Sequence, residues 1–357
     1  MNADELARSV QSQGVAQAVA AGCAARGDGR GRWSREVGGA TEVLFDLASL
    51  TKPMTAVAVV RAGIDPTTPL GALVAEARGT ASESVPLELL LAHRAGLAAH
   101  RPLYAPLLSG PGGRVDRPAA LREAAEARRP EASGPVPPEG FDPLYSDLGY
   151  ILAGEALARA TGARDAGEAI DRLVLAPLGI DGQAGTARDL ASRGKGGPFA
   201  PTEQVAWRGG VVSGAVHDEN AWALAGLGGC GHAGIFGTID AVLTFGSAVL
   251  DALEGRGPFG DRSLQWLVRE RAGGTLRAGF DGKTVVGSSA GSRMGPRTFG
   301  HLGFTGTSLW LDPDALVAVG LLTNRVFPTR EHLAIREARP WAHDALFDRA
   351  VLLPQGG

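Results

Sequence analysis

The stretch Phe45-Asp-Leu-Ala-Ser-Leu-Thr-Lys-Pro53 places a serine three residues before a lysine and precedes the apolar run 54–60, which suits a buried helix. A proline inside a helix costs about 3 kcal/mol, so the helix is expected to begin just before Pro53, near Ser49. Free backbone N–H groups and the positive end of the helix dipole would then surround the Ser49 hydroxyl. Residues three apart share a helix face, so Lys52 is predicted to face Ser49.

A serine hydroxyl becomes a good nucleophile when a neighbouring base takes its proton. Lysine is such a base where burial or a nearby cation lowers its pKa, whereas arginine stays charged. The chain has only three lysines among 35 basic residues, Lys52, Lys195 and Lys283. The alternative is a chance match, because the same spacing recurs at Ser192-Arg-Gly-Lys195. That copy lies in a glycine-rich loop with nothing to fix its geometry.

A second stretch, Tyr145-Ser-Asp147, stands where irregular chain gives way to a helix expected over 147–160. A tyrosine beside a lysine cation can have a lowered phenol pKa and serve as a base for attacking water. The alternative makes Asp147 a helix N-cap and Tyr145 a packed aromatic side chain.

A third stretch, Phe299-Gly-His-Leu-Gly-Phe-Thr-Gly-Thr307, leads into a predicted strand. Glycine at 303 would let a substrate lie along this edge, and the Phe304 N–H could then point at an oxyanion. His301 offers a hydrogen-bond donor, or a cation at lower pH, for a substrate carboxylate. The alternative is a glycine-rich turn with a surface histidine. Lys283-Thr-Val285 lacks the glycine of a comparable motif and is rejected as the site.

Composition describes an ordinary globular protein. The 357 residues are 44% apolar and 20% charged, which allows one large domain or two intertwined ones. A net charge of −3 with scattered arginines argues against a nucleic-acid partner. Cys23 and Cys230 indicate neither a disulfide framework nor a metal motif. The acidic start of the chain, with no long apolar run, predicts no signal peptide or membrane segment and hence a cytoplasmic location.

Strand patterns occur at both ends of the chain. Segments 14–25 and 32–40 flank a glycine turn at 26–29, and 308–312 and 316–323 read as a second hairpin. The helix containing Ser49 is expected over 49–62, others lie between 66 and 225, including 84–93, and a final helix is expected over 331–352. The pattern predicts an α+β fold whose antiparallel sheet is built from both termini.

This order of elements also suggests a division into domains. Residues 1–65 and 225–357 would form the sheet domain and 66–224 a mainly helical one, with the active site at their interface. The segment 105–143 is rich in proline, glycine and charge. It is expected to be either a surface excursion or a flap over the site.

With these three stretches assembled, the chain resembles the serine β-lactamase and penicillin-binding-protein superfamily, in particular its class C-like (H-x-G) branch of carboxypeptidases, esterases and amidases. The likeness runs over about 40–340 and includes Leu90-Leu-Ala-His-Arg-Ala-Gly-Leu97, Ala176-Pro-Leu-Gly-Ile180 and Leu321-Leu-Thr-Asn-Arg325. It implies a β-lactamase/transpeptidase-like fold, with helices flanking the sheet and a mainly helical inserted domain.

The resemblance also implies roles. Ser49 would be the acylated nucleophile, Lys52 its proton acceptor and Tyr145 the general base, while Asp147 stands where the family more often has asparagine. The N–H groups of Ser49 and Phe304 would form the oxyanion hole. His301-Leu-Gly303 falls where lactamases and peptidases usually carry K-T-G. The chain lacks that lysine and threonine, which grip a substrate carboxylate, and this argues against efficient β-lactam hydrolysis.

A further set of residues around 202–236 resembles a subgroup that includes enzymes placed in cell-wall (muropeptide) recycling. Within it, His217, Asp218 and His232 are expected to form a polar network at the substrate pocket. A zinc site is the alternative, but no E-x-x-H or H-x-H spacing supports it. We therefore expect no metal and no cofactor. The predicted substrate-binding residues are Asp147, His301, Gly303, His217, Asp218 and His232.

The sequence thus predicts a serine hydrolase that forms an acyl-enzyme on Ser49. It would hydrolyse a small amide or ester, such as a peptidoglycan fragment, as an amidase or D-amino-acid peptidase. One alternative is a broad carboxylesterase with weak or no β-lactamase activity. Another is a catalytically silent relative that binds cell-wall fragments, although the combination of Ser49, Lys52 and Tyr145 argues against it. The sequence makes no prediction of oligomeric state.

Overall fold

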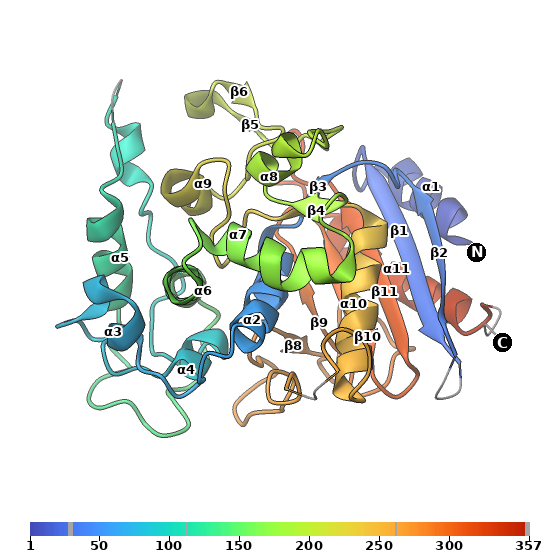
Figure 1. Ribbon diagram of the computed structural model, residues 1–357. Helices are drawn as coiled ribbons and strands as arrows, with labels where there is room; N and C mark the ends of the chain where they lie inside the picture. The colour runs from blue at the N-terminus through green and yellow to red at the C-terminus, as the bar shows by residue number, and fades with distance from the viewer. Residues whose placement is uncertain (28–30, 111–112, 261–262, 354–357) are drawn as a thin grey trace.

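A six-stranded antiparallel sheet forms the centre of the protein, in the order β2-β1-β11-β10-β9-β8 (Figure 1). The computed structural model describes residues 1–27, 31–110, 113–260 and 263–353. The first strand, β1, pairs with the last strand, β11, so the prediction of a sheet built from both termini is confirmed. The strands are β1 (Val19–Arg26), β2 (Trp33–Gly39), β8 (Asp281–Gly282), β9 (Phe299–Leu302), β10 (Ser308–Asp312) and β11 (Val317–Thr323).

Helices cover both faces of this sheet. Helix α10 (Ile239–Leu253) packs on one face, and α1 (Ala3–Ser12) and α11 (Ile335–Ala350) pack on the other (Figure 1). Gly22 of β1 lies opposite Gly320 of β11. A Cβ at these positions would lie 2.8 Å and 2.9 Å from side chains of α10, so the paired glycines allow the helix to approach closely.

The remaining helices lie between β3 and β7 in the chain and to one side of the sheet (Figure 1). They are α2 (Thr51–Arg61), α3 (Leu70–Leu73), α4 (Leu87–Leu91), α5 (Arg117–Glu126), α6 (Asp147–Thr161), α7 (Ala166–Ile170), α8 (Ala187–Ser192) and α9 (Glu219–Ala225). Shorter helical turns are η1 (Ala48–Leu50), η2 (Ala75–Ala77), η3 (Ala105–Leu108), η4 (Asp171–Leu175), η5 (Ala176–Leu178) and η6 (Ala206–Arg208). The division into two domains stays a prediction.

A small three-stranded sheet brings the segment before Ser49 next to the segment after His232. Its order is β3-β7-β4, and the Leu47 N–H extends this pairing by donating to the Ile235 carbonyl at 3.0 Å. A separate pair of two-residue strands joins β5 to β6. These short strands are β3 (Phe45–Asp46), β4 (Ala184–Gly185), β5 (Gln204–Val205), β6 (Gly210–Val211) and β7 (Phe236–Gly237).

Several local predictions differ from the structure. Helices α1 and α10 were not predicted, and the helix expected over 84–93 is only α4, Leu87–Leu91. The helix expected from Ser49 begins with the turn η1 and becomes α-helical at Thr51. Pro53 is then its third residue, where the N–H has no partner within the helix and its loss costs little. Two residues of the predicted turn at 26–29 lie outside the described residues.

Across the described parts of the chain, no helix is both long and apolar enough to cross a membrane.

Cys23 and Cys230 are both buried free thiols. Burial raises the pKa of the Cys23 thiol to about 12, so it stays protonated at neutral pH.

Candidate active site

Ser49 lies in a tight turn whose neighbours fix its position. Ala48 before it has a φ of 48°, in the left-handed region that a non-glycine residue rarely adopts. The Asp46 carboxylate holds this turn by accepting the Ala48 N–H at 2.8 Å and the His217 N–H at 2.6 Å. Backbone strain of this kind is often found at functional residues. Here it directs the Ser49 side chain toward a pocket.

Lys52 follows on the first turn of α2 and is completely buried. Its Nζ donates to the Ser49 Oγ at 2.8 Å, so the spacing brings the two side chains together as predicted. The same Nζ lies 2.8 Å from the Oδ1 of Asp147 and 3.4 Å from the His232 carbonyl oxygen. Lys52 therefore bridges the serine hydroxyl and a carboxylate.

Asp147 is available for Lys52 because another residue caps the helix. The N-cap of α6 is Ser146, whose Oγ accepts the Gly149 N–H, so the alternative of Asp147 as an N-cap is wrong. The Asp147 N–H donates to the Ala99 carbonyl at 3.0 Å. This leaves its carboxylate facing Lys52 and the pocket.

The Lys52–Asp147 pair sets the charge state of the site. Burial alone would lower the pKa of Lys52, but the Asp147 charge and Tyr145 outweigh it, and the pKa is raised above its ordinary value. Burial alone would raise the pKa of Asp147, but Lys52 and His232 lower it. Lys52 is therefore a cation and Asp147 a carboxylate at neutral pH. A lowered pKa, the condition under which a lysine is itself the base, is therefore not met by Lys52, because of this carboxylate.

Tyr145 is held by a loop that follows α4. The Leu144 N–H donates to the His93 carbonyl and the Ser146 N–H to the His93 Nδ1, each at 3.0 Å. The His93 ring stacks on Tyr145 with centroids 4.6 Å apart. The Lys52 Nζ lies 4.8 Å from the centre of the Tyr145 ring, so the phenol is close to the lysine charge.

The charge state of Tyr145 differs from the prediction. Burial raises the pKa of its phenol, and although Lys52 opposes this, Asp147 adds to it, so the pKa lies above its ordinary value. Tyr145 is therefore a neutral phenol at neutral pH. The predicted lowering of its pKa considered Lys52 alone.

The structure corrects the role expected of His301. Its side chain is buried, with the ring centroid 5.9 Å from that of Tyr145, and it does not line the pocket, whereas Leu302 and Gly303 do. Burial, with the Lys52 charge nearby, lowers the pKa of His301 to about 3. Its Nδ1 lies 2.8 Å from the Leu302 carbonyl and so carries the proton. His301 is a neutral packing residue, so it offers the substrate no cation.

The segment after β9 is fastened to the turn before Ser49. Thr305 Oγ1 donates to the Asp46 carbonyl at 2.7 Å, and Thr307 Oγ1 donates to the Leu47 carbonyl at 3.0 Å. A Cβ at Gly303 would lie 1.9 Å from Thr307 Oγ1 and 2.6 Å from the Leu47 carbonyl oxygen. This close contact therefore requires glycine at position 303. The sequence analysis gave a different reason for the glycine, namely room for a substrate along the strand edge.

Two arginines hold the other side of the same segment. Arg339 is buried, and its Nη2 donates to the Gly303 and Thr307 carbonyls, both at 2.9 Å. Arg325 Nε donates to the Phe304 carbonyl at 2.8 Å. The Gly303 carbonyl and the Phe304 N–H belong to one peptide group, so a cation on this oxygen polarises that N–H. Ser49 and Phe304, the predicted oxyanion-hole residues, both line the pocket.

The predicted polar network is present beside Lys52. His232 Nε2 lies 2.8 Å from the Asp218 Oδ1, and His217 Nε2 lies 3.0 Å from the Glu203 Oε2. Burial alone would lower the pKa of His232, but Asp218 outweighs it and raises the pKa to about 10. His232 is thus a second buried cation. Within the described residues, no group of three or more His, Cys, Asp or Glu side chains is placed to hold a metal ion.

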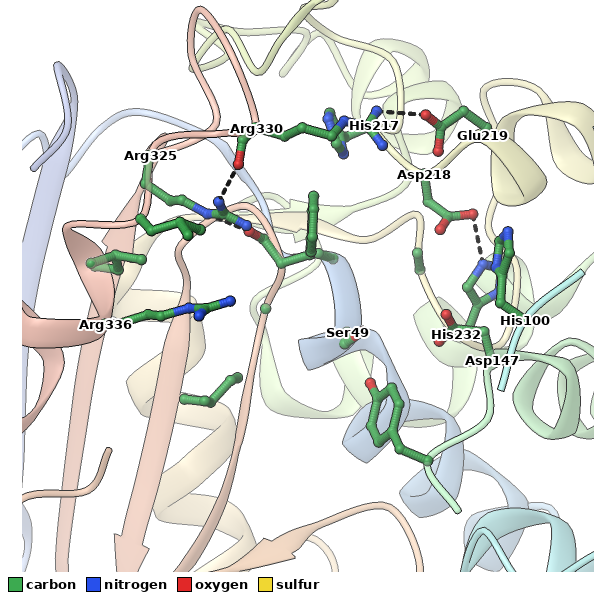
Figure 2. Close-up of a pocket in the computed structure, with 18 of the residues that line it drawn as sticks. Ser49, His100, Asp147, His217, Asp218, Glu219, His232, Arg325, Arg330 and Arg336 are labelled. Atoms are coloured by element: carbon green, nitrogen blue, oxygen red, sulfur yellow. Dashed lines mark hydrogen bonds and ion pairs between the residues drawn. The ribbon is translucent and has the colours of Figure 1, made fainter. Parts of the chain in front are cut away.

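A pocket of about 490 Å³ connects these groups, a volume typical of small-molecule sites. In Figure 2, Arg325, Arg330 and Arg336 come from one wall, Asp147, Asp218 and His232 come from the other, and Ser49 lies between them. Of the predicted residues, those that line the pocket are Ser49, Tyr145, Asp147, His217, Asp218, His232, Gly303 and Phe304.

The sequence did not point to several other lining residues. Arg330, Arg336 and Arg339 of the second wall belong to no motif, Arg325 was noted only as the end of Leu321–Arg325, and His100 and Tyr104 carry no motif either. Among the described residues of 105–143 none lines the pocket, and α5 packs against α6, which favours the surface excursion over the flap. Ser192 and Lys195, the second S-x-x-K match, lie outside the pocket as expected.

Comparisons with known proteins point to one family. The sequence profile of the family described as Beta-lactamase matches residues 6–340. A protein from Escherichia coli O157:H7, whose name gives D-alanyl-D-alanine carboxypeptidase as a provisional assignment, is 27% identical over 206 residues. The match covers 52% of this chain and 46% of that protein. The chain thus spans about half the length of the curated relatives it matches.

Solved structures share the fold over nearly the whole chain. A class C beta-lactamase from Rhodobacter sphaeroides has a TM-score of 0.67 at 15% identity, covering 97% of this chain and 98% of that one. A family VIII carboxylesterase has a TM-score of 0.62 at 16% identity, covering 94% and 95%. These likenesses confirm the predicted fold class.

Proposed function

Because the chain belongs to the beta-lactamase family, we propose that it is a serine hydrolase that forms an acyl-enzyme on Ser49 and hydrolyses a small amide or ester. The observation that carries this proposal is the position of Lys52 Nζ, 2.8 Å from both the Ser49 Oγ and the Asp147 Oδ1 at the wall of the pocket. A hydroxyl, a cation and a carboxylate in this order provide a path for the proton that the nucleophile must lose.

Acylation would begin with a proton shift along this path. As the Ser49 Oγ attacks the substrate carbonyl carbon, its proton passes to Lys52, and Lys52 passes one of its own to Asp147. Lys52 remains a cation throughout, and Asp147 becomes neutral. The negative charge that develops on the substrate oxygen is stabilised by the N–H groups of Ser49 and Phe304.

Tyr145 would supply the proton that the leaving group needs. A neutral phenol beside the Ser49 Oγ can protonate the departing nitrogen or oxygen, and the resulting phenolate is stabilised by Lys52. In the second step this phenolate takes a proton from water, whose hydroxide attacks the acyl carbon. Ser49 then regains its proton from Asp147 through Lys52, so every proton is accounted for.

Of the two substrate classes, amides and esters, a neutral phenol favours amides. An amine is a poor leaving group until it is protonated, whereas many ester alcohols leave more readily. We propose peptidoglycan fragments as the natural amides, supported by the residues around 202–236 and by the carboxypeptidase relatives. A carboxylesterase remains the second candidate because the same residues would cleave esters.

The test of the proposed function is covalent labelling. A fluorophosphonate is expected to add once to the protein, and peptide mass spectrometry is expected to place the adduct on Ser49. Ser49→Ala should abolish labelling, and Ser192→Ala, at the second S-x-x-K match, should leave it unchanged. An adduct at Ser192, or an unlabelled protein that is correctly folded by circular dichroism, would exclude the proposed nucleophile.

Asp147→Asn is expected to change the pH dependence of acylation. With the carboxylate removed, burial dominates and the pKa of Lys52 falls, so Lys52 loses its charge as the pH rises. At pH 7 the variant should acylate about tenfold more slowly, because Lys52 in its charged form has no acceptor for its proton. Its rate should rise as a higher pH removes the Lys52 charge, whereas the wild-type rate should stay flat. Stopped-flow acylation by a p-nitrophenyl ester measures both.

Asp142→Asn provides the matched control, because it removes the same charge from an exposed residue five positions earlier in the chain. It should leave the profile as in the wild type. If Asp147→Asn acylates at the wild-type rate with a flat profile, Asp147 takes no part in the proton transfer.

A further inference from the structure

The turn that carries His232 lies between the helix of Lys52 and the helix of Asp147. On the side of α2, Lys52 Nζ donates to the His232 carbonyl oxygen at 3.4 Å. On the side of α6, which begins at Asp147, a Cβ added at Gly231 would lie 2.1 Å from the Tyr150 carbonyl oxygen, so the turn and the helix are in close contact. The fold therefore places His232 near both members of the Lys52–Asp147 pair.

Helix α9 fixes the carboxylate that pairs with His232 (Figure 2). Asp218 is the N-cap of α9, and its Oδ1 accepts the Ala221 N–H at 2.7 Å and lies 2.8 Å from the His232 Nε2. The residue before it, His217, donates its backbone N–H at 2.6 Å to Asp46, which also holds the turn of the nucleophile. The His232–Asp218 pair is therefore fixed relative to the nucleophile.

Three ionised neighbours act on the Asp147 carboxylate. Lys52 and His232 stabilise its negative charge, whereas Asp218 opposes it, and the effect of His232 is larger than that of Asp218. The His232–Asp218 pair as a whole therefore favours the ionised form of Asp147. The other titratable side chains around Asp147 or along the same pocket are the neutral Tyr145, His93 and His301, together with His100, His217 and Glu219.

We propose that the His232–Asp218 pair keeps Asp147 ionised at acid pH and so sets the lowest pH at which Asp147 can accept the serine proton. This inference rests on the proposed hydrolase function and adds two residues to it. Both are positioning residues, because they act on the reaction through Asp147. His232 is only 1% exposed, so its charge is little screened by water.

The pH dependence follows from the role of Asp147 as the final acceptor of the proton. Acylation needs its ionised form, so the rate falls once the pH drops through the pKa of Asp147. A cation near a carboxylate lowers the pKa of that carboxylate, and an anion raises it. Loss of the His232 charge should therefore move the acid limit of acylation to higher pH, and loss of the Asp218 charge should move it back.

Two variants use this difference in sign. His232→Gln removes the cation but keeps a hydrogen-bond donor beside Asp218, so Asp147 is left with a neighbouring anion and its pKa should rise. Adding Asp218→Asn removes that anion, so the pKa of Asp147 should fall part of the way back. If the pair had only a structural role, the double variant would be no better than the single one, because it loses further contacts.

The first measurement is the rate of acylation by a p-nitrophenyl ester, followed by stopped flow across the pH range. The ratio of the rate at about pH 4.5 to the rate at about pH 8 should be at least about threefold lower in His232→Gln than in the wild type, as for loss of a nearby opposite charge. The double variant should recover part of that ratio. His332→Gln is the matched control, because it makes the same substitution at a half-buried histidine outside the pocket, and it should match the wild type.

The second measurement needs no turnover. In Ser49→Ala protein labelled with ¹³C at the aspartate carboxyl groups, the resonance that is missing after Asp147→Asn identifies Asp147. This resonance should titrate at higher pH when His232→Gln is added, and at an intermediate pH when Asp218→Asn is added as well. If His232→Gln is not folded by circular dichroism, His232→Asn replaces it, because its shorter side chain needs less space.

The outcomes separate this inference from the proposed function. If no ester acylates the protein but the Asp147 resonance moves up and then partly back, the hydrolase proposal fails and the action of the pair on Asp147 stands. If esters do acylate it and His232→Gln lowers the rate by one factor at every pH, the pair is structural and the inference is overturned. An unmoved resonance in His232→Gln, or a double variant without recovery, would also overturn it and would leave the hydrolase proposal standing.

Discussion

Lys52→Arg is expected to lower the rate of acylation by about ten-thousandfold, a loss comparable to removal of one member of a catalytic triad. The change keeps the positive charge and the ion pair with Asp147 but replaces an amine with a guanidinium, which holds its protons too tightly to pass them on. Lys52 is also completely buried, so the planar guanidinium has no room to approach Ser49 as the amine does. Stopped-flow measurement of p-nitrophenol release gives the acylation rate directly.

Lys195→Arg is the matched control, since it makes the same substitution at the exposed lysine of the second S-x-x-K match. It should leave the rate unchanged. Circular dichroism must show that Lys52→Arg is folded before its rate is interpreted. A folded variant that retains more than a tenth of the wild-type acylation rate would show that the charge of Lys52 is sufficient and that its proton transfer is not required.

The position of Ser49 and Lys52 could be predicted because local rules determine it. The spacing of the two residues fixes a shared helical face, and Pro53 limits where the helix can begin. The antiparallel sheet was predictable for a similar reason, since the strand patterns at both ends are short and regular. These features depend on residues that are close together in the chain.

Charge states could not be predicted in the same way. The charge of Lys52 depends on Asp147, which lies almost a hundred residues further along the chain. It also depends on how deeply Lys52 is buried, which the neighbouring sequence does not indicate. Lys52 pairs with Asp147 and His232 pairs with Asp218, and the His232 charge also helps to keep the pKa of Asp147 low. Had asparagine occupied position 147, the same pattern would have implied a different charge on Lys52.

The arginine wall was missed for a further reason. Arg336 and Arg339 lie on a helix whose sequence looks like an ordinary surface helix, and only the tertiary fold turns its first turn toward the pocket. Conversely, His301 belonged to a recognised motif, but its side chain packs near Tyr145 and does not line the pocket. Alternate residues of β9 face opposite sides of the sheet, and it is Leu302 that faces the pocket. A motif identifies a strand, whereas the side each residue faces depends on register.

Gly303→Ala is expected to lower kcat by roughly 100-fold to 1,000-fold, as does removal of an oxyanion-hole donor in other enzymes. The added Cβ would lie 1.9 Å from Thr307 Oγ1 and 2.6 Å from the Leu47 carbonyl oxygen, so the strand edge must move away from the Ser49 turn. That movement carries the Phe304 N–H with it. Because an oxyanion-hole donor acts mainly on the charge that develops during the reaction, KM should change far less than kcat, which steady-state kinetics with a p-nitrophenyl ester would reveal.

Two further variants separate this geometric effect from a general loss of stability. Gly182→Ala adds the same methyl group where the nearest atom, Lys195 Cε, is 3.9 Å away, so it should behave as the wild type. Adding Thr307→Ala to Gly303→Ala removes the closer clash but leaves the one with Leu47, and should restore only part of the rate. If Gly303→Ala is folded and its kcat falls by less than threefold, the strand edge moves without displacing the Phe304 N–H, and the oxyanion must be stabilised by other donors.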